Sequence, residues 1–211
     1  MNTESISTPR HGKEVRFGDL ILAFTSQFEH RWSDTGSGAV QDVSFYHPVP
    51  PTGFHALGSI CIGNSRDSYD PNDKIAVLCV KAVEDVEYKP PLVWAEKFQC
   101  IWNDAGSRAF KDGSCWRPIA PPGYVALGDV FVEGYAAPSL HDVMCVAEEL
   151  VVRGSIGECI WTDRGSGADR DFGAWRIDPS LNFSDPDNGI FSVGGFVGYG
   201  AHEKLSREPL I

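Results

Sequence analysis

The residues best suited to recognise a ligand lie in a short motif, W-x-D-x-G-S, that occurs three times in the chain. Each copy offers a carboxylate that accepts hydrogen bonds and a hydroxyl that can donate and accept them. An aromatic residue follows each Trp at an offset of fourteen positions, and a basic-type residue comes directly after it. The candidate ligand-binding residues are therefore Asp34, Ser37, Asp104, Ser107, Asp163, Ser166, Arg117 and Arg176, with His47 at the position equivalent to the two arginines.

Two kinds of ligand suit this set of side chains. Carboxylates that accept hydrogen bonds from sugar hydroxyls, next to an aromatic ring that stacks on C–H faces, would form a glycan site. An arginine together with backbone N–H groups would instead suit the phosphate of a lipid head group. A third interpretation is purely structural, because Asp followed by Gly is typical of a turn. The residue types leave all three interpretations open.

The sequence contains none of the familiar catalytic patterns. It has no phosphate-binding G-x-x-x-x-G-K-[ST] loop, no H-E-x-x-H metal motif and no G-x-S-x-G elbow, and its histidines show no ligand-like spacing. We therefore expect a protein that is not an enzyme and that uses no cofactor or metal, the alternative being a hydrolase whose site is assembled from loops. Two acidic stretches could bind calcium but fit ordinary turns better: Asp67, Asp70 and Asp73, and Asp185 and Asp187.

Repetition of this motif is the strongest signal in the chain and predicts its architecture. The tryptophans Trp32, Trp102 and Trp161 are separated by 102−32 = 70 and 161−102 = 59 residues. Further residues match at fixed offsets, among them the second aspartates Asp42, Asp112 and Asp171 and the pairs Leu57/Leu127 and Gly58/Gly128. We expect repeats near residues 17–90, 91–149 and 150–200 in one domain, 17–211, after a disordered lead-in over residues 1–16.

Short apolar runs, such as "DLILAF", "PLVWAEKF" and "EELVVRG", precede the three motifs. They are bounded by Gly, Pro, Asp and Asn, which is typical of strands, and no long segment has a helical period. Three all-β units predict a body with approximate three-fold symmetry, either a β-prism or a β-trefoil, and the length of the repeats favours the prism. The three tryptophans should then meet near the pseudo-axis and form its core.

Charge and the terminal sequence limit the partners. The net charge of −11 opposes phosphate backbones, so we expect no nucleic-acid partner. It also disfavours a broad electrostatic contact with anionic membranes, although a local basic pocket stays possible. The polar N-terminal stretch lacks the apolar segment of a signal peptide, which predicts a cytoplasmic protein with reduced cysteines.

The segments "WxDxGSGA", "WRP" and "PPGYVALGDV" resemble the family of vacuolar protein sorting-associated protein 62, over roughly Phe17 to Tyr199. The second repeat carries this resemblance most clearly. The first has "FYHP" in place of "WRP", and the third has "WRIDPSLNF" in place of "WRPIAPPGY". The resemblance implies a link to vacuolar or endosomal trafficking. It adds an adaptor that binds a protein partner as the alternative to a glycan- or lipid-binding module at a membrane surface.

Overall fold

The structure, a computed structural model, describes residues 14–64, 70–72, 74–84, 89–179, 190 and 192–203. In these residues the chain is all-β, as predicted, and its one helical element is a 3-10 turn, Glu148–Leu150 (η1). No helix in this part of the chain has the length and apolar character that crossing a membrane requires. The lead-in expected over residues 1–16 lies almost entirely outside the described residues, and the first strand begins at Val15.

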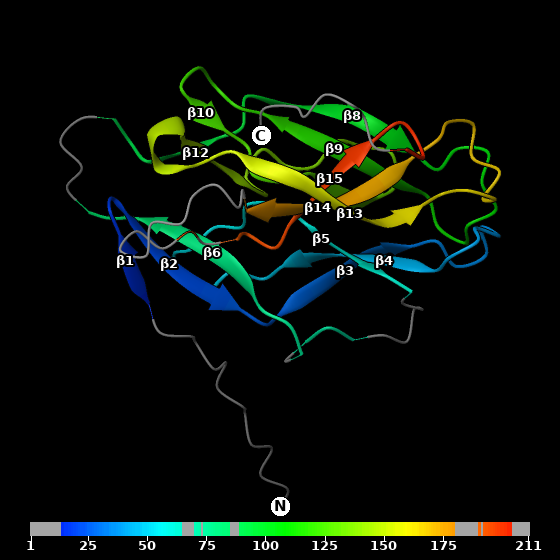
Figure 1. The fold of residues 1–211 in the computed structure, drawn as a ribbon, viewed down its shortest axis with the longest axis horizontal. Coiled ribbons are helices and arrows are strands. Elements are labelled where there is room, and N and C mark those ends of the chain that lie inside the picture. The colour runs from blue at the N-terminus through cyan, green and yellow to red at the C-terminus, as the bar shows by residue number, and fades with distance from the viewer. Residues whose placement is uncertain are drawn as a thin grey trace, which may run out of the picture.

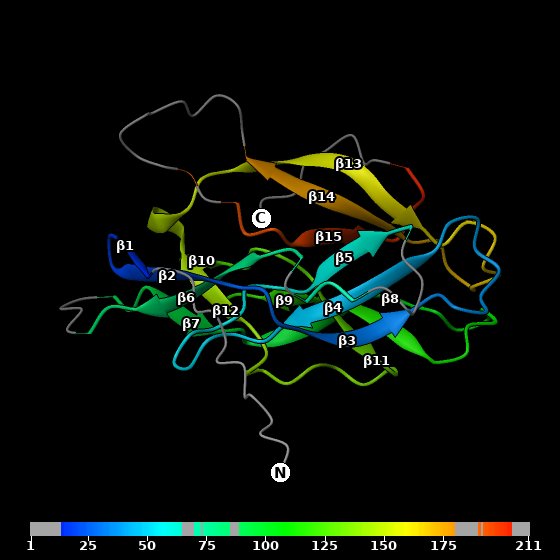
Figure 2. The ribbon, with the colours of Figure 1, turned by 90° about the horizontal axis from the view of Figure 1, so that it is seen from below.

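Each repeat forms one antiparallel three-stranded sheet around its W-x-D-x-G-S motif, and we call these the inner sheets. The first contains β3 (Phe28–Ser33), β4 (Val43–Pro48) and β5 (Ile60–Gly63). The second contains β8 (Lys97–Asn103), β9 (Gly113–Ile119) and β11 (Val130–Glu133). The third contains β13 (Gly154–Thr162), β14 (Gly173–Pro179) and β15 (Phe196–Tyr199). Figure 2 shows β13 and β14 along one side of the body and β3 and β4 along another.

The first two repeats each add a second, outer sheet. One consists of β1 (Val15–Phe17), β2 (Leu20–Thr25) and β6 (Val77–Ala82). The other consists of β7 (Leu92–Trp94), β12 (Met144–Ala147) and β10 (Tyr124–Val125). The described part of the third repeat has no matching outer sheet. Figure 1 shows the outer sheets at the left end of the body, whereas the loops that follow β3, β8 and β13 gather at the right end.

A bulge precedes each motif tryptophan at the same place in its strand. The pairing register shifts between His30 and Trp32, between Cys100 and Trp102, and between Cys159 and Trp161. A bulge inserts one extra residue and re-aims the side chains that follow it. The repeat therefore preserves a backbone irregularity as well as a residue type, and each tryptophan enters the core in an equivalent way.

The three motif tryptophans form the core of the inner sheets. Each is at most 1% exposed, and their ring centroids lie 6.0, 6.1 and 6.3 Å apart in edge-to-face arrangements. Edge-to-face packing is favourable because the positive edge of one ring meets the negative face of another. Phenylalanines fill the space around them, namely Phe45, Phe131, Phe172 and Phe196. The prediction that these tryptophans are buried and form one shared core is confirmed.

The indole N–H groups close a ring of hydrogen bonds around this axis. Each donates to the backbone carbonyl nine residues after the next tryptophan: Trp32 Nε1 to Lys111 O at 2.7 Å, Trp102 Nε1 to Arg170 O at 2.9 Å, and Trp161 Nε1 to Gln41 O at 2.7 Å. Backbone amides return the contact in the opposite direction: Phe110 N to Thr35 O, Asp169 N to Ala105 O, and Val40 N to Arg164 O. Every repeat is thus joined by hydrogen bonds to both others.

Candidate functional site

The predicted ligand-binding aspartates and serines lie inside the turns that follow β3, β8 and β13. Each carboxylate accepts a hydrogen bond from the backbone amide nine residues later: Val43 N to Asp34 Oδ1 at 2.9 Å, Gly113 N to Asp104 Oδ1 at 2.9 Å, and Phe172 N to Asp163 Oδ1 at 2.8 Å. Each serine hydroxyl accepts one from the amide two residues later: Ala39 N to Ser37 Oγ at 3.0 Å, Ala109 N to Ser107 Oγ at 3.2 Å, and Ala168 N to Ser166 Oγ at 3.1 Å.

This geometry favours the structural interpretation of the motif. The three aspartates are at most 5% exposed, and the glycine between Asp and Ser has a positive φ in every copy (+89° at Gly36, +85° at Gly106, +91° at Gly165). Only glycine adopts this region at little cost, which explains the fixed D-x-G-S order. The six Asp and Ser side chains satisfy backbone groups of their own loops. Their role in ligand binding stays a prediction.

Asp34 gives this interpretation a pH-dependent test. Burial raises its pKa to about 6, helped by the neighbouring Asp42 and opposed by the hydrogen bond from Val43. Because the folded pKa lies above the unfolded value, wild-type stability falls as the pH rises from about 4 to about 6. Asp34→Asn keeps an acceptor for the Val43 amide and removes the charge. Its unfolding free energy relative to wild type should rise by about 1–3 kcal/mol between pH 4.5 and pH 7, measured by urea unfolding.

The control for this pH test is Asp34→Ala, which removes the acceptor as well as the charge. It should lose the hydrogen bond to the Val43 amide at every pH and therefore be less stable than Asp34→Asn throughout. A difference between Asp34→Asn and wild type that stays constant from pH 4.5 to pH 7 would contradict titration of Asp34 in this range.

Arg117, predicted to contact a ligand, is held by an internal ion pair. Its Nε and Nη2 atoms lie 2.9 and 2.8 Å from the two carboxylate oxygens of Asp129, and Nη2 also donates to the Gly198 carbonyl at 2.8 Å. Gly198 N donates in return to Asp129 Oδ2 at 2.7 Å. Asp129 is 3% exposed at its side chain, so this pair joins β9 to β15 inside the protein. The N–H groups of Arg117 at Nε and Nη2 are therefore paired with protein acceptors.

The third predicted basic position is engaged differently. Arg176 is 53% exposed, and its guanidinium forms ion pairs with Asp178 and Glu158 on the surface. The residue equivalent to Asp129 in this repeat is Phe196, because Val197 pairs with Trp175 as Val130 pairs with Trp116. Arg176 therefore has no buried carboxylate at that position and pairs with the acids of its own sheet. The three basic-type residues do not form equivalent sites.

A cleft of about 230 Å³ opens beside His47, the basic-type residue of the first repeat. The cleft lies between the first and second repeats. Its polar lining comes from Glu29 on β3, His47 on β4, His55, and the neighbours His141 and Asp142 before β12. Pro48, Val49, Pro50 and Phe54 supply an apolar wall. Residues as far apart in the sequence as Glu29 and Asp142 thus lie in one cleft, because the loop before β12 of the second repeat lies against the inner sheet of the first.

An exposed tryptophan stands beside this cleft. The Trp94 ring lies 5.0 Å from the His55 ring and 5.0 Å from the His141 ring, edge-to-face with both. Trp94 is 36% exposed, in contrast to the three core tryptophans. Its equivalent in the first repeat is Phe24 (24+70 = 94), which is 40% exposed. An apolar ring held between two imidazoles at the edge of a polar cleft is suited to bind a ligand that has both an apolar face and polar groups.

The charges around the cleft do not favour an anion. Burial, assisted by Arg31, lowers the pKa of His47 to about 4, so its imidazole is neutral at pH 7. Its Nε2 faces the Asp142 carbonyl at 3.3 Å and its Nδ1 faces Ser59 Oγ at 3.2 Å, which fits an Nε2–H tautomer that accepts from the serine. The nearby cation Arg31 already contacts Glu29 at 3.4 Å. The cleft thus presents neutral imidazole and carboxylate oxygens rather than free positive charge.

An equivalent cleft of about 270 Å³ lies between the second and third repeats. Tyr124 and Val125 line this second cleft, at the positions that Phe54 and His55 hold in the first cleft. Arg117 stands in the place of His47. The Arg117–Asp129 pair lies in its wall. The Tyr124 hydroxyl donates to the Pro90 carbonyl, and Lys89 covers its ring at 4.5 Å. Only the first of these two clefts therefore combines an exposed aromatic ring with imidazoles.

Trp94, His55, His141, Glu29 and Asp142 were not among the residues predicted to bind a ligand. Trp94 lies in the apolar run "PLVWAEKF", which predicts a strand but does not reveal which side chains stay exposed. A usable signal was the aligned pair Phe24 and Trp94, two aromatics at the same place in successive repeats. Of the predicted calcium ligands, only Asp70 belongs to the described residues, and its carboxylate accepts from Asn72 N at 2.9 Å.

Comparisons with known proteins agree with this architecture. The model of the family described as vacuolar protein sorting-associated protein 62 matches residues 8–210. Among solved structures, the crystal structure of GNIP1Aa from Chromobacterium piscinae is similar, with a TM-score of 0.68 and 28% sequence identity. The similarity covers 86% of this chain and 33% of that chain, so this chain spans about a third of the length of GNIP1Aa. No curated protein matches the sequence.

Proposed function

The chain belongs to the vacuolar protein sorting-associated protein 62 family, and on that premise we propose that it is a non-enzymatic recognition module that binds a neutral glycan in the cleft beside Trp94. The observation that carries this proposal is the exposed Trp94 ring, placed between His55 and His141 at the edge of a cleft that Glu29 and Asp142 also line. Of the two ligand classes expected from the sequence, a glycan or a lipid head group, we keep the glycan, and we move its site away from the W-x-D-x-G-S loops.

A sugar offers both apolar and polar groups to a binding site. A pyranose ring has C–H groups that stack on an aromatic ring, and hydroxyls that need acceptors and donors placed around it. Trp94 supplies the ring, the carboxylates of Glu29 and Asp142 supply acceptors, and His55 and His141 supply ring nitrogens. The volume of about 230 Å³ is below the roughly 300–1,000 Å³ of pockets for drug-sized ligands, which fits one terminal sugar residue.

A phosphate head group fits this cleft less well. Phosphate recognition needs unpaired cationic or amide donors. Arg117 is bound to Asp129, Arg176 to Asp178 and Glu158, and Arg31 lies against Glu29. The net charge of −11 adds a repulsive field. We therefore place neutral glycans before phosphoinositides among the ligands, and a glycan on a trafficked protein or lipid would agree with the family's name.

Trp94→Ala tests the proposal against a matched control. Wild-type protein should bind a defined subset of neutral sugars on a glycan array, in competition with the free sugar. Trp94→Ala should weaken that binding at least about tenfold, because central aromatic residues dominate small interfaces. Phe24→Ala removes an exposed aromatic from the equivalent strand position and should bind like wild type. Circular dichroism and the unfolding midpoint of both variants establish that they are folded.

The alternatives have distinct outcomes in the same set of experiments. Phosphoinositide binding that Arg176→Ala abolishes would select a lipid head group. If wild type binds neither glycans nor lipids but binds a trafficking protein, the adaptor interpretation replaces this proposal. Bound glycan should be recovered with unchanged mass after prolonged incubation. Hydrolysed sugar would show that the carboxylates of the cleft catalyse a reaction and that the module is an enzyme.

A further inference from the structure

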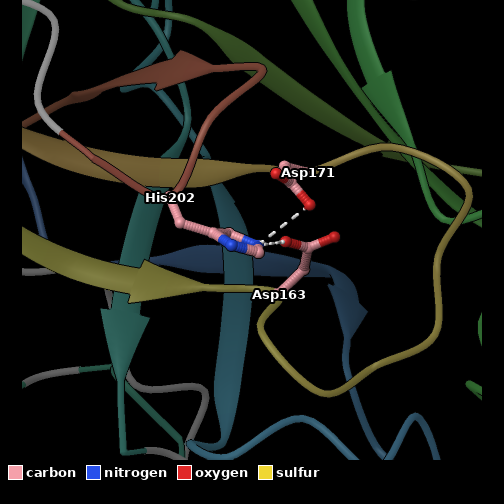
Figure 3. A group of neighbouring side chains, drawn as sticks. All are labelled: Asp163, Asp171 and His202. Atoms are coloured by element: carbon pink, nitrogen blue, oxygen red, sulfur yellow. Dashed lines mark hydrogen bonds and ion pairs between the residues drawn. The ribbon is translucent and has the colours of Figure 1, made fainter.

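Three side chains with metal-binding atoms converge at the loop end of the third repeat (Figure 3). His202 Nε2 lies 2.6 Å from Asp163 Oδ1 and 3.6 Å from Asp171 Oδ1. The three ligand atoms all lie within 4.8 Å of one another. Asp163 follows β13, Asp171 precedes β14, and His202 follows β15, so three separate segments supply one ligand atom each. In the described part of the chain, no other set of three such side chains comes as close together.

The surroundings give this cluster one closed side and one open side. The side chain of Asp163 is 3% exposed, that of His202 is 18% exposed and that of Asp171 is 66% exposed. Two carboxylates held together near a buried surface repel each other, and a cation between them would relieve that repulsion.

We propose that Asp163, Asp171 and His202 bind a first-row divalent cation, with Zn²⁺ as the representative ion and one coordination position open to solvent. One imidazole nitrogen and two carboxylate oxygens are ordinary ligands for zinc, whereas calcium and magnesium take oxygen ligands and rarely imidazole. His202 Nε2 already points between the two carboxylate oxygens (Figure 3). This nitrogen would be the third ligand, beside one oxygen from each carboxylate.

The second repeat provides an internal comparison. Its motif aspartate is Asp104 and its second aspartate is Asp112, at the same offsets as Asp163 and Asp171. The group beside them is the phenol of Tyr135, whose hydroxyl lies 3.2 Å from Asp112 Oδ1. Burial raises the pKa of this phenol, and both aspartates raise it further, so it is a neutral donor and a poor ligand. Of these two repeats, only the third therefore has the three ligands, although the aspartate pair is common to both.

Isothermal titration of the metal-free chain with ZnCl₂ tests the proposal. Wild type should bind one Zn²⁺ at this site with micromolar or tighter affinity. His202→Gln and Asp171→Asn should each weaken that binding at least tenfold, because each removes one of three ligands. Asp163 is left unchanged because its carboxylate also holds the turn through the Phe172 amide.

Two matched variants locate the ion. Asp112→Asn makes the same charge change at the equivalent position of the second repeat, and His141→Gln removes an exposed imidazole of the glycan cleft. Both should retain wild-type affinity for the ion at this site. Titration with Co²⁺ gives a second measurement, in which wild type should show a visible d–d absorption band that His202→Gln abolishes. The proposal is overturned if wild type binds Zn²⁺ only at millimolar concentration, or if His141→Gln removes the binding and His202→Gln retains it.

Discussion

Replacing Trp102 with Ala should lower the free energy of unfolding by about 3–5 kcal/mol, the range for a large aromatic residue removed from a packed core. Trp102 is 1% exposed, stacks on Phe172 at 4.9 Å and contacts the rings of Trp32 and Trp161. The substitution leaves a cavity on the pseudo-axis where all three repeats meet. It also removes the donor for the Arg170 carbonyl, which loses its bond to the indole at 2.9 Å.

Urea unfolding of Trp102→Ala, followed by far-ultraviolet circular dichroism, measures this cost. Trp94→Ala is the matched control, because it truncates a tryptophan that is 36% exposed and should cost about 1 kcal/mol or less. The stability loss of Trp102→Phe should lie between those of Trp102→Ala and Trp94→Ala, since phenylalanine fills most of the cavity but lacks the N–H group. A loss below about 1 kcal/mol for Trp102→Ala would contradict a core shared by the three repeats.

Replacing Arg117 with Met should cost a comparable amount, about 3–5 kcal/mol, because it leaves the buried carboxylate of Asp129 without its cation. Asp129 would retain the hydrogen bond from Gly198 N at 2.7 Å, but a single amide does not replace a bidentate guanidinium. In the first repeat, neutral residues occupy the positions equivalent to Arg117 and Asp129. They are His47 and Ser59, and His47 Nδ1 lies 3.2 Å from Ser59 Oγ. The double change Arg117→His with Asp129→Ser should therefore restore part of the lost stability.

The control for this experiment is Arg176→Met in the third repeat. Arg176 is 53% exposed and pairs with surface carboxylates, so its removal should leave the unfolding free energy nearly unchanged. Equal losses for Arg117→Met and Arg176→Met, measured in the same denaturant series, would contradict the assignment of Arg117 to a buried pair.

The sequence was sufficient to predict the all-β class and the burial of Trp32, Trp102 and Trp161. These features repeat along the chain, and a residue type conserved at a fixed offset in three copies indicates a shared structural role. The ring of indole hydrogen bonds could not be predicted, because its acceptors are backbone carbonyls that leave no mark on residue identity. The bulge before each tryptophan was not predicted either, because the residue two positions before it is a cysteine in two repeats, Cys100 and Cys159, but a histidine, His30, in the first.

Prediction was weaker for the candidate site. The sequence does not distinguish an aspartate that binds a sugar from one that accepts a hydrogen bond from a backbone amide in its own turn. Only the burial of the side chain in the structure separates the two. Arg117 looks like a free donor until Asp129, twelve residues away, is placed beside it by the β9–β11 pairing. The cleft and the cation site each combine residues from distant segments. Trp94 meets His55 and His141, and His202 meets Asp163, across spacings that match no linear motif.

An NMR titration of the indole N–H signals tests the central claim most directly, that recognition occurs beside Trp94 rather than at the W-x-D-x-G-S loops. The chain has six tryptophans, and each gives one such signal. On addition of the sugar that binds best on the array, the Trp94 indole signal should shift while those of Trp32, Trp102 and Trp161 stay in place. An unchanged Trp94 indole signal, together with shifts of the backbone amide signals of Gly36, Gly106 or Gly165, would contradict this claim. It would show that the ligand binds at the W-x-D-x-G-S loops.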